Sequence, residues 1–400
     1  MRTYRELFGT KEFTPLFVSS AAQVAAQTVS GLALGTLVYS ATGNPLLSGL
    51  AMFGPSLAQV AGAATLLSAA DRLPPRAALA GLALVLALGT AALSIPGLPV
   101  WAMLVILLAQ GLLASLGGGV RYGLLNEILA GGGYLLGRSA LNMANGAMQI
   151  GGFAVGGVLV SVLSPRGTLL TGAALYLVAA AAVAGLRRHP PRATGRPSPA
   201  ETWRSNALLW SSRPRRRVYI ALWLPNGLVV GCESLFVPYA PQHAGLLFAC
   251  AAAGMLAGDV LAGRFIPPAW RARLVTPLHL LLAVPYLIFV LSPPTPVAAV
   301  AVTLASVGYA ATLLLQDRLM ELTPDELSGH ALGLHSSGMI AMQGVAAALA
   351  GALAQRTSPA AAMAVLAVAS VAVTVFLPAR PEPSPGVASG PRRRSSGAEG

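Results

Sequence analysis

Long apolar stretches separated by short connectors make up most of the chain. Twelve of them are long enough to cross about 30 Å of hydrocarbon as an α-helix, which rises about 1.5 Å per residue. Strands of a membrane barrel would be shorter and would alternate apolar with polar residues. The pattern predicts an all-α membrane protein with twelve transmembrane helices, near residues 14–39, 46–69, 77–95, 100–120, 140–163, 167–186, 218–240, 245–263, 274–292, 297–315, 332–354 and 359–377.

Positive charge is concentrated in alternate connectors. If the N-terminus is cytoplasmic, only Arg166 and Arg356 of the 26 Lys and Arg residues face outwards, whereas Arg121 and Arg138, for example, fall in a cytoplasmic connector. Cytoplasmic loops of membrane proteins carry an excess of Lys and Arg. The charges therefore predict that both termini are cytoplasmic. They also support twelve spans, because an odd number would mix the charges between the two sides.

Composition narrows the class of protein further. Hydrophobic residues make up 55% of the chain and charged residues 10%, less than half the share that is usual in soluble proteins. The net charge of +13 lies in connectors and tails, which indicates membrane topology and does not match a nucleic-acid footprint. The two cysteines, Cys232 and Cys250, lie in apolar runs and predict neither a disulfide framework nor a metal site.

A Pro-, Arg- and Ser-rich segment interrupts the apolar stretches at mid-chain, as is typical of a linker. The last part of the chain has too little apolar content to fold. The sequence therefore predicts four parts: a six-helix bundle over residues 1–186, a basic cytoplasmic linker over 187–217, a second six-helix bundle over 218–379 and a disordered cytoplasmic tail over 380–400.

Two short patterns recur in both halves at nearly the same spacing. A Met-Gln pair at 148–149, in the predicted fifth span, recurs 194 residues later at 342–343, in the eleventh. The connector at 70–76, after the second span, has a counterpart 193 residues later at 263–268, after the eighth. Two anchors at one offset indicate duplicated halves. Paired bundles that rock about a central site are a common plan of secondary transporters.

The connector after the second span contains Ala70-Asp71-Arg72 followed by Arg76. This pattern resembles the Gly-x-x-x-Asp-Arg-x-Gly-Arg-Arg signature of the major facilitator superfamily, and the likeness in topology covers residues 10–380. The glycine-rich run at 146–157 is similar to a motif of exporters in that superfamily, and the stretch at 127–142 resembles its macrolide-efflux and siderophore-export branch. The resemblance implies a monomeric, multi-pass transporter of the plasma membrane that works by alternating access and favours efflux.

Glu233 is the strongest candidate for a functional residue. It lies well inside the predicted seventh span, where an acid costs about 2.5–3.5 kcal/mol to insert and therefore usually faces a cavity. Asn226 lies seven residues earlier on the same helical face. We expect Glu233 to carry protons or to contact substrate. The alternative is a protonated glutamic acid that is hydrogen-bonded between helices.

Polar residues on other predicted spans extend this interpretation. Gln23 and Gln27 belong to one stripe of the first span, together with Ser20 and Ser30. Gln110 lies in the fourth span and Tyr309 in the tenth. The resemblance implies that spans one, four, seven and ten line the central cavity, so these side chains are candidates for the substrate and proton pathway. Interhelical hydrogen bonds are the alternative.

Charged residues at the predicted cytoplasmic ends of the helices are candidates for gating. Asp71, Arg72 and Arg76 follow the second span, and Asp259 lies near Arg264 at the end of the eighth. A charge latch between the bundles would bias one conformation over the other. The alternatives are ordinary topology charges and a helix-end ion pair.

The sequence carries no sign of ATP hydrolysis or catalysis. The glycine runs at 117–119 and 131–133 lack the Gly-Lys-Ser/Thr ending of a nucleotide loop, and no Ser/His/Asp set or metal-ligand cluster is present. We expect no enzymatic activity and no cofactor. The favoured hypothesis is a proton-coupled antiporter for efflux of drug-like or secondary-metabolite compounds, whose partners are a small-molecule substrate, protons and membrane lipids, without nucleic acid. A metabolite importer or facilitator of the same fold and a non-transport membrane scaffold are the alternatives.

Overall fold

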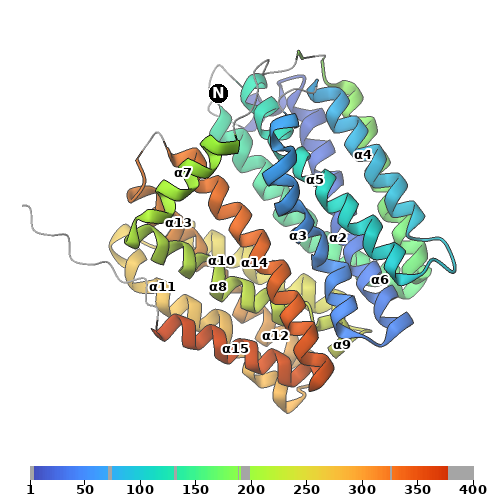
Figure 1. Cartoon of the computed structure of the whole chain (residues 1–400), viewed down its shortest axis with the longest axis vertical. Coiled ribbons are helices and arrows are strands. Elements are labelled where there is room, and N and C mark those ends of the chain that lie inside the picture. Colours follow the sequence, from blue (N-terminus) through green and yellow to red (C-terminus); the bar gives the residue numbers. More distant parts are fainter. Residues whose placement is uncertain are drawn as a thin grey trace, which may run out of the picture.

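The computed structural model of the chain describes residues 4–70, 74–129, 133–187, 189–190, 199–324 and 327–376. Every regular element in these ranges is an α-helix or a short 3-10 helix (Figure 1). The all-α prediction is therefore confirmed.

The first half of the chain forms a group of long helices, which we call the N-terminal bundle. Figure 1 shows them together, in blue to cyan-green, on the right of the molecule. Pro75 begins one helix at a position where its missing N–H has no partner to lose. The elements are α1 (Tyr4–Phe8), α2 (Phe13–Thr42), α3 (Pro45–Ala70), α4 (Pro75–Ala92), α5 (Val100–Ile128), α6 (Tyr134–Ala182) and the 3-10 turn η1 (Val183–Gly185).

The second half forms a corresponding group, the C-terminal bundle, whose helices are interrupted more often. Short 3-10 segments continue two of its helices, and a brief α-turn follows a third. The elements are α8 (Arg213–Glu233), α9 (Phe236–Tyr239), α10 (Ala244–Phe265), α11 (Pro268–Ala283), η2 (Val284–Leu291), α12 (Thr295–Val307), η3 (Gly308–Ala310), α13 (Ala311–Glu321), α14 (Ser328–Arg356) and α15 (Pro359–Phe376).

Ten segments of the described residues are long and apolar enough to cross a membrane. This number differs from the predicted twelve in two places. Helix α3, 26 residues long, is not among the ten. The predicted fifth and sixth spans form the single 49-residue element α6, in which Ser164 has a left-handed φ of 68° and is followed by Pro165. The helical backbone is therefore broken at Ser164, between the two predicted spans.

Similar close contacts between helices occur within each bundle. A Cβ atom on Gly62 of α3 would lie 2.6 Å from Ser115 Oγ of α5, and one on Gly254 of α10 would lie 2.9 Å from Ser306 Cβ of α12. The two glycines are 192 residues apart and the two serines 191, close to the spacing of the repeat in the sequence. Small residues let membrane helices approach closely. The same device thus holds a helix pair in each half.

The two bundles meet along α3 with α14 and along α6 with α10. A Cβ on Gly245 would lie 2.5 Å from Gly157 Cα, and the rings of Phe153 and Phe248 stack with centroids 4.7 Å apart. These contacts lie towards the start of α10 and the break in α6, which is the end of the molecule remote from the mid-chain linker. The bundles are closed against each other at that end.

Part of the predicted linker is helical. Helix α7 (Pro199–Ser211) lies within residues 187–217, and α8 begins at Arg213, earlier than the predicted span at 218. Leu209 is fully buried, and the Trp210 ring stacks on Trp223 of α8 at 5.6 Å. These apolar contacts fix α7 on the C-terminal bundle. The predicted tail at 380–400 lies outside the described residues.

Candidate functional site

Glu233 lies in the interior of the C-terminal bundle. Its side chain is 7% exposed, and two tyrosine hydroxyls donate to Oε1: Tyr309 at 3.2 Å and Tyr286 at 3.5 Å. A buried carboxyl group needs hydrogen-bonding partners to offset its loss of water. The structure therefore brings together two of the predicted pathway residues, Glu233 and Tyr309, with Tyr286 as a third member.

Each of these three residues lies where a helix is interrupted. Glu233 is the last residue of α8, Tyr286 belongs to η2 and Tyr309 to η3. A 3-10 segment within a membrane helix has weaker backbone hydrogen bonds than an α-helix and often marks a hinge. The hydrogen bonds of one carboxyl group therefore join three segments at which helices are interrupted.

Asn226 takes part in a separate contact. It is fully buried on α8, and its Nδ2 donates to Thr312 Oγ1 of α13 at 2.7 Å and to Leu222 O at 2.9 Å. Its Oδ1 has no hydrogen-bond partner among the described residues. Asn226 and Glu233 thus share one helix but contact different parts of the tenth predicted span.

The N-terminal bundle encloses a cavity of about 90 Å³. Its polar lining comes from neutral amide and hydroxyl groups, and no carboxylate of the described residues contributes to it. Apolar side chains such as Leu34 and Leu107 complete the wall. The polar residues that line the cavity are Gln23, Gln27, Ser30, Ser56, Gln59, Thr90, Gln110 and Tyr176. Three predicted pathway residues, Gln23, Gln27 and Gln110, therefore face one cavity.

Two of these amides are held by neighbouring helices. Gln110 Nε2 donates to Leu86 O at 3.0 Å and to Thr90 Oγ1 at 3.3 Å. Gln23 Oε1 accepts a hydrogen bond of 2.6 Å from the guanidinium of Arg121. The prediction that Arg121 belongs to a connector is wrong: α5 continues to Ile128, and the side chain points to α2 within the bundle.

The sequence of this helical chain matches a known family. The family model described as Major Facilitator Superfamily covers residues 16–312. The chain belongs to the Major Facilitator Superfamily. The family and its fold are those of membrane transporters, and they confirm the resemblance at the level of the superfamily. No curated protein sequence matches the chain.

Solved structures of superfamily-like transporters share the fold. The nucleoside transporter NupG has a TM-score of 0.72 at 14% identity, with 91% of this chain and 98% of that chain covered. A POT family transporter in complex with 5-aminolevulinic acid has a TM-score of 0.71 at 11% identity, covering 91% and 95%. A bacterial homolog to the human lysosomal transporter Spinster has a TM-score of 0.66 at 14% identity, covering 94% and 95%. At such low identity the likeness concerns the fold alone.

Two of the four predicted gating residues of this superfamily member lie within the described residues. Asp71 and Arg72 lie outside the described residues, whereas Arg76 lies in the first turn of α4 and is partly exposed. Asp259 is exposed on α10 and forms no ion pair with any described residue. The ion pairs near this end of the C-terminal bundle are Arg271 with Asp317 and Arg318 with Glu321.

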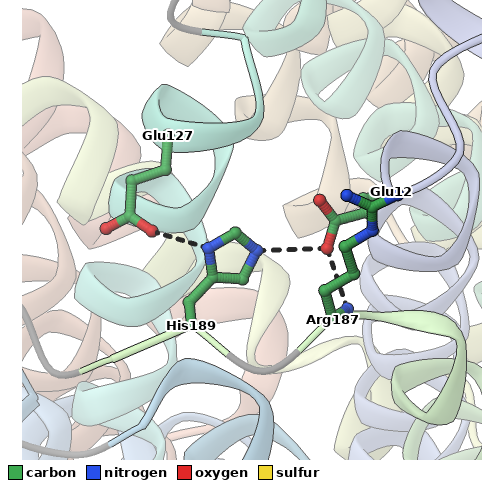
Figure 2. A network of polar contacts seen from close by, with 4 residues as sticks. All are labelled: Glu12, Glu127, Arg187 and His189. Carbon is green, nitrogen blue, oxygen red and sulfur yellow. Dashed lines mark hydrogen bonds and ion pairs between the residues drawn. The ribbon is translucent and has the colours of Figure 1, made fainter.

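A polar network ties the start of the linker to the N-terminal bundle. Figure 2 shows the imidazole of His189 between two carboxylates: Nε2 lies 3.1 Å from Glu12 Oε1 and Nδ1 lies 3.4 Å from Glu127 Oε2. The backbone N–H of Arg187 also donates to Glu12, at 2.8 Å. Burial alone would raise the pKa of Glu12, but these hydrogen bonds outweigh it and hold the pKa below its ordinary value. These contacts fix the chain that follows η1 beside the start of α2 and the end of α5.

Sequence reasoning missed several polar residues of the interior. Tyr286 lies in an apolar stretch without a polar stripe, so periodicity gives no signal for it. His335 of α14 contacts Gln316 of α13 through Nε2 at 2.9 Å, and its carbonyl oxygen accepts from the Trp223 indole at 3.1 Å. The available signal is residue type, because a polar or ionisable side chain inside a long apolar helix usually faces the interior of the bundle and has a partner there.

Proposed function

We propose that this superfamily member is a proton-coupled secondary transporter that moves small organic solutes by alternating access. The observation that carries the proposal is the buried carboxyl group of Glu233, held by Tyr286 and Tyr309 where three interrupted helices meet. A carboxyl group that gains a proton can no longer accept two hydrogen bonds at a full negative charge. Protonation would therefore weaken its ties to η2 and η3, and those segments could then shift relative to α8.

The proposed topology has twelve spans with both termini in the cytoplasm. In it α3 is the second span, and the two arms of α6 on either side of Ser164 are the fifth and sixth. Support comes from the length of α3, from the backbone break at Ser164 and from the arginine-rich connectors. The domain limits at 186, 217 and 379, the plasma membrane and a monomeric state belong to the same proposal.

The polar cavity of the N-terminal bundle is the proposed substrate site. Gln23, Gln27 and Gln110 offer hydrogen-bond donors and acceptors, while leucine side chains provide apolar contact. A cavity that combines polar groups with apolar side chains suits a small organic molecule. Asn226 extends the proposed pathway into the C-terminal bundle.

Efflux is the favoured direction, and it rests on the resemblance of residues 127–157 to exporters. Within that stretch, Gly152 packs on Thr28 of α2 and Gly157 on Gly245 of α10. Small residues therefore keep α6 close to a helix of its own bundle and to a helix of the other bundle. The proposed gate consists of Asp71, Arg72 and Arg76 in one half and Asp259 in the other. An importer or facilitator would use the same architecture.

Reconstitution into vesicles tests the proposal. The purified full chain would face an imposed pH gradient and a panel of neutral, cationic and anionic aromatic solutes, with movement followed by mass spectrometry. We expect gradient-driven accumulation of at least one solute by the native chain, and a loss of at least about tenfold in Glu233→Gln, because an amide cannot exchange a proton. Glu321→Gln, which removes an exposed carboxylate at the end of α13, is the matched control and should behave as native.

Two results would count against the proposal. Solute movement that ignores the gradient and survives Glu233→Gln would reject proton coupling at this residue. Failure of every solute to move would favour a scaffold. The direction of transport is tested separately in cells that lack the protein: unchanged tolerance across many toxic compounds would contradict efflux.

A further inference from the structure

Arg121 is a cation within the N-terminal bundle that lacks a carboxylate partner. It lies inside α5, seven residues before the helix ends, and it donates a hydrogen bond to the neutral amide oxygen of Gln23 at 2.6 Å. No described Asp or Glu forms an ion pair with it. A guanidinium has five N–H donors, and a single amide leaves its charge uncompensated.

Two described carboxylates of the N-terminal bundle, one of them on the same helix as Arg121, have other partners. Glu127, in the last turn of α5, contacts His189, and Glu12 accepts hydrogen bonds from Arg187 and His189. Two arginines in the helices of the C-terminal bundle differ from Arg121. Arg271 and Arg318 each pair with a carboxylate. Arg215 of α8 also has a neutral partner, Leu208 O at 3.0 Å, but that oxygen does not line the cavity, whereas the Gln23 partner of Arg121 does.

A charge inside a membrane protein is costly unless it is paired, and unpaired ones commonly mark a pathway for ions or substrates. The partner of Arg121, Gln23, lines the cavity of the N-terminal bundle. The guanidinium thus lies one hydrogen bond away from the cavity wall. An anionic group in the cavity would reach Arg121 by joining or replacing the Gln23 oxygen.

The rest of the lining fits the remainder of such a molecule. Gln27, Gln59 and Gln110 supply neutral groups that repel no anion, and the part of the lining that the structure describes contains no acidic side chain. Leu34, Leu107 and further leucines supply apolar surface for an aliphatic or aromatic body.

We propose that Arg121 recognises the anionic group of an amphipathic organic anion, such as a carboxylate or sulfonate, bound in the cavity of the N-terminal bundle. This inference rests on the proposed substrate site and names the class of its ligand. Gln23 positions the guanidinium while the cavity is empty, and the charge of the solute replaces this weaker partner during binding. Charge-assisted hydrogen bonds are about twice as strong as neutral ones.

Binding of two isosteric probes tests the inference. Benzenesulfonate carries a permanent negative charge, whereas benzenesulfonamide has nearly the same shape and is neutral at neutral pH. We would measure both affinities by titration calorimetry on the purified full chain in a neutral detergent. The native protein is expected to bind the sulfonate at least about tenfold more tightly than the sulfonamide.

Three variants make the test specific. Arg121→Gln should abolish the preference for the sulfonate, and Arg121→Lys, which keeps the charge but not the planar fork, should retain part of it. Arg138→Gln is the matched control: Arg138 is exposed, lies over the Tyr122 ring at 5.7 Å and should not affect binding. If Arg121→Gln does not fold, a selective loss of sulfonate affinity in Arg121→Lys supports the inference, and an unchanged preference overturns it.

Equal affinity for the two probes, or a preference that survives Arg121→Gln, would overturn the inference. The titration is repeated in lipid discs of phosphatidylcholine with and without phosphatidylglycerol. Suppression of sulfonate binding by phosphatidylglycerol would assign the site to a lipid headgroup and would likewise overturn a solute site. Transport without a preference for anions contradicts only this inference, whereas Arg121-dependent binding without any transport contradicts only the proposed function.

Discussion

The two bundles share a packing scheme but differ in the charge of their interiors. In both, a glycine of one helix lies against a serine of another at corresponding positions, Gly62 with Ser115 and Gly254 with Ser306. The N-terminal bundle holds a cation, Arg121, against the neutral amide of Gln23. The C-terminal bundle holds a carboxylic acid, Glu233, against tyrosine hydroxyls. Backbone packing has thus stayed alike while the polar interior has diverged, which points to different tasks for the two halves.

Removing a close contact of the α3–α5 pair or of the α10–α12 pair should have the largest effect on the protein. A Cβ on Gly111 of α5 would lie 2.2 Å from Pro55 O, and one on Gly254 would lie 2.2 Å from Thr303 O. Because backbone atoms must move, Gly111→Ala and Gly254→Ala should each lower the free energy of unfolding by roughly 1–3 kcal/mol. Thermal unfolding in detergent measures this.

Two glycines in the same helices serve as controls. A Cβ on Gly118 of α5 meets nothing within 4 Å, and one on Gly263 of α10 meets only a leucine methyl group at 3.9 Å. Gly118→Ala and Gly263→Ala should leave the melting temperature unchanged or raise it, because alanine favours a helix more than glycine. If one bundle tolerated its close-contact substitution and the other did not, the packing would not be equivalent.

The network around His189 should have the smallest effect, and it belongs to the N-terminal bundle alone. Because the pKa of Glu12 is lowered in the folded protein, ionised Glu12 stabilises the fold. This contribution to the free energy of unfolding is complete above the pH range in which a free glutamate titrates. It is lost as the pH falls through the lower, folded pKa. We expect Glu12→Gln to leave the melting temperature nearly unchanged but to speed amide exchange at Arg187, whose N–H it accepts.

Hydrogen exchange of the peptide that contains residues 183–190 measures this effect. Native protein at neutral pH should protect it, and strong acid should remove the protection. Glu321→Gln, a substitution in the other bundle, should not change it. Protection of Arg187 that persists in Glu12→Gln would show that the linker is held by other contacts.

Much of the fold follows from the sequence because the thickness of the bilayer sets the length of each apolar stretch. The stretch boundaries near Ala41-Thr42 and at Ser164-Pro165 fall where the structure ends α2 and breaks α6. Glu233 could be chosen because an acid is conspicuous in an apolar helix. The contact between Glu233 and Tyr286 depends on how three helices are rotated and interrupted. The residue pattern of one span does not predict this. The inward direction of Arg121 similarly depends on the length and rotation of α5.

Alternating access requires the two bundles to move against each other during transport. The side chains of Asn44 and Gln355 form a hydrogen bond between the bundles at the end remote from the linker. We would replace both by cysteine, with Cys232 and Cys250 changed to alanine, and join them with a short reducible crosslinker in vesicles. We expect crosslinking to stop proton-driven solute movement, reduction to restore it, and neither single-cysteine protein to respond. Undiminished transport by fully crosslinked protein would show that this movement of the bundles is not needed.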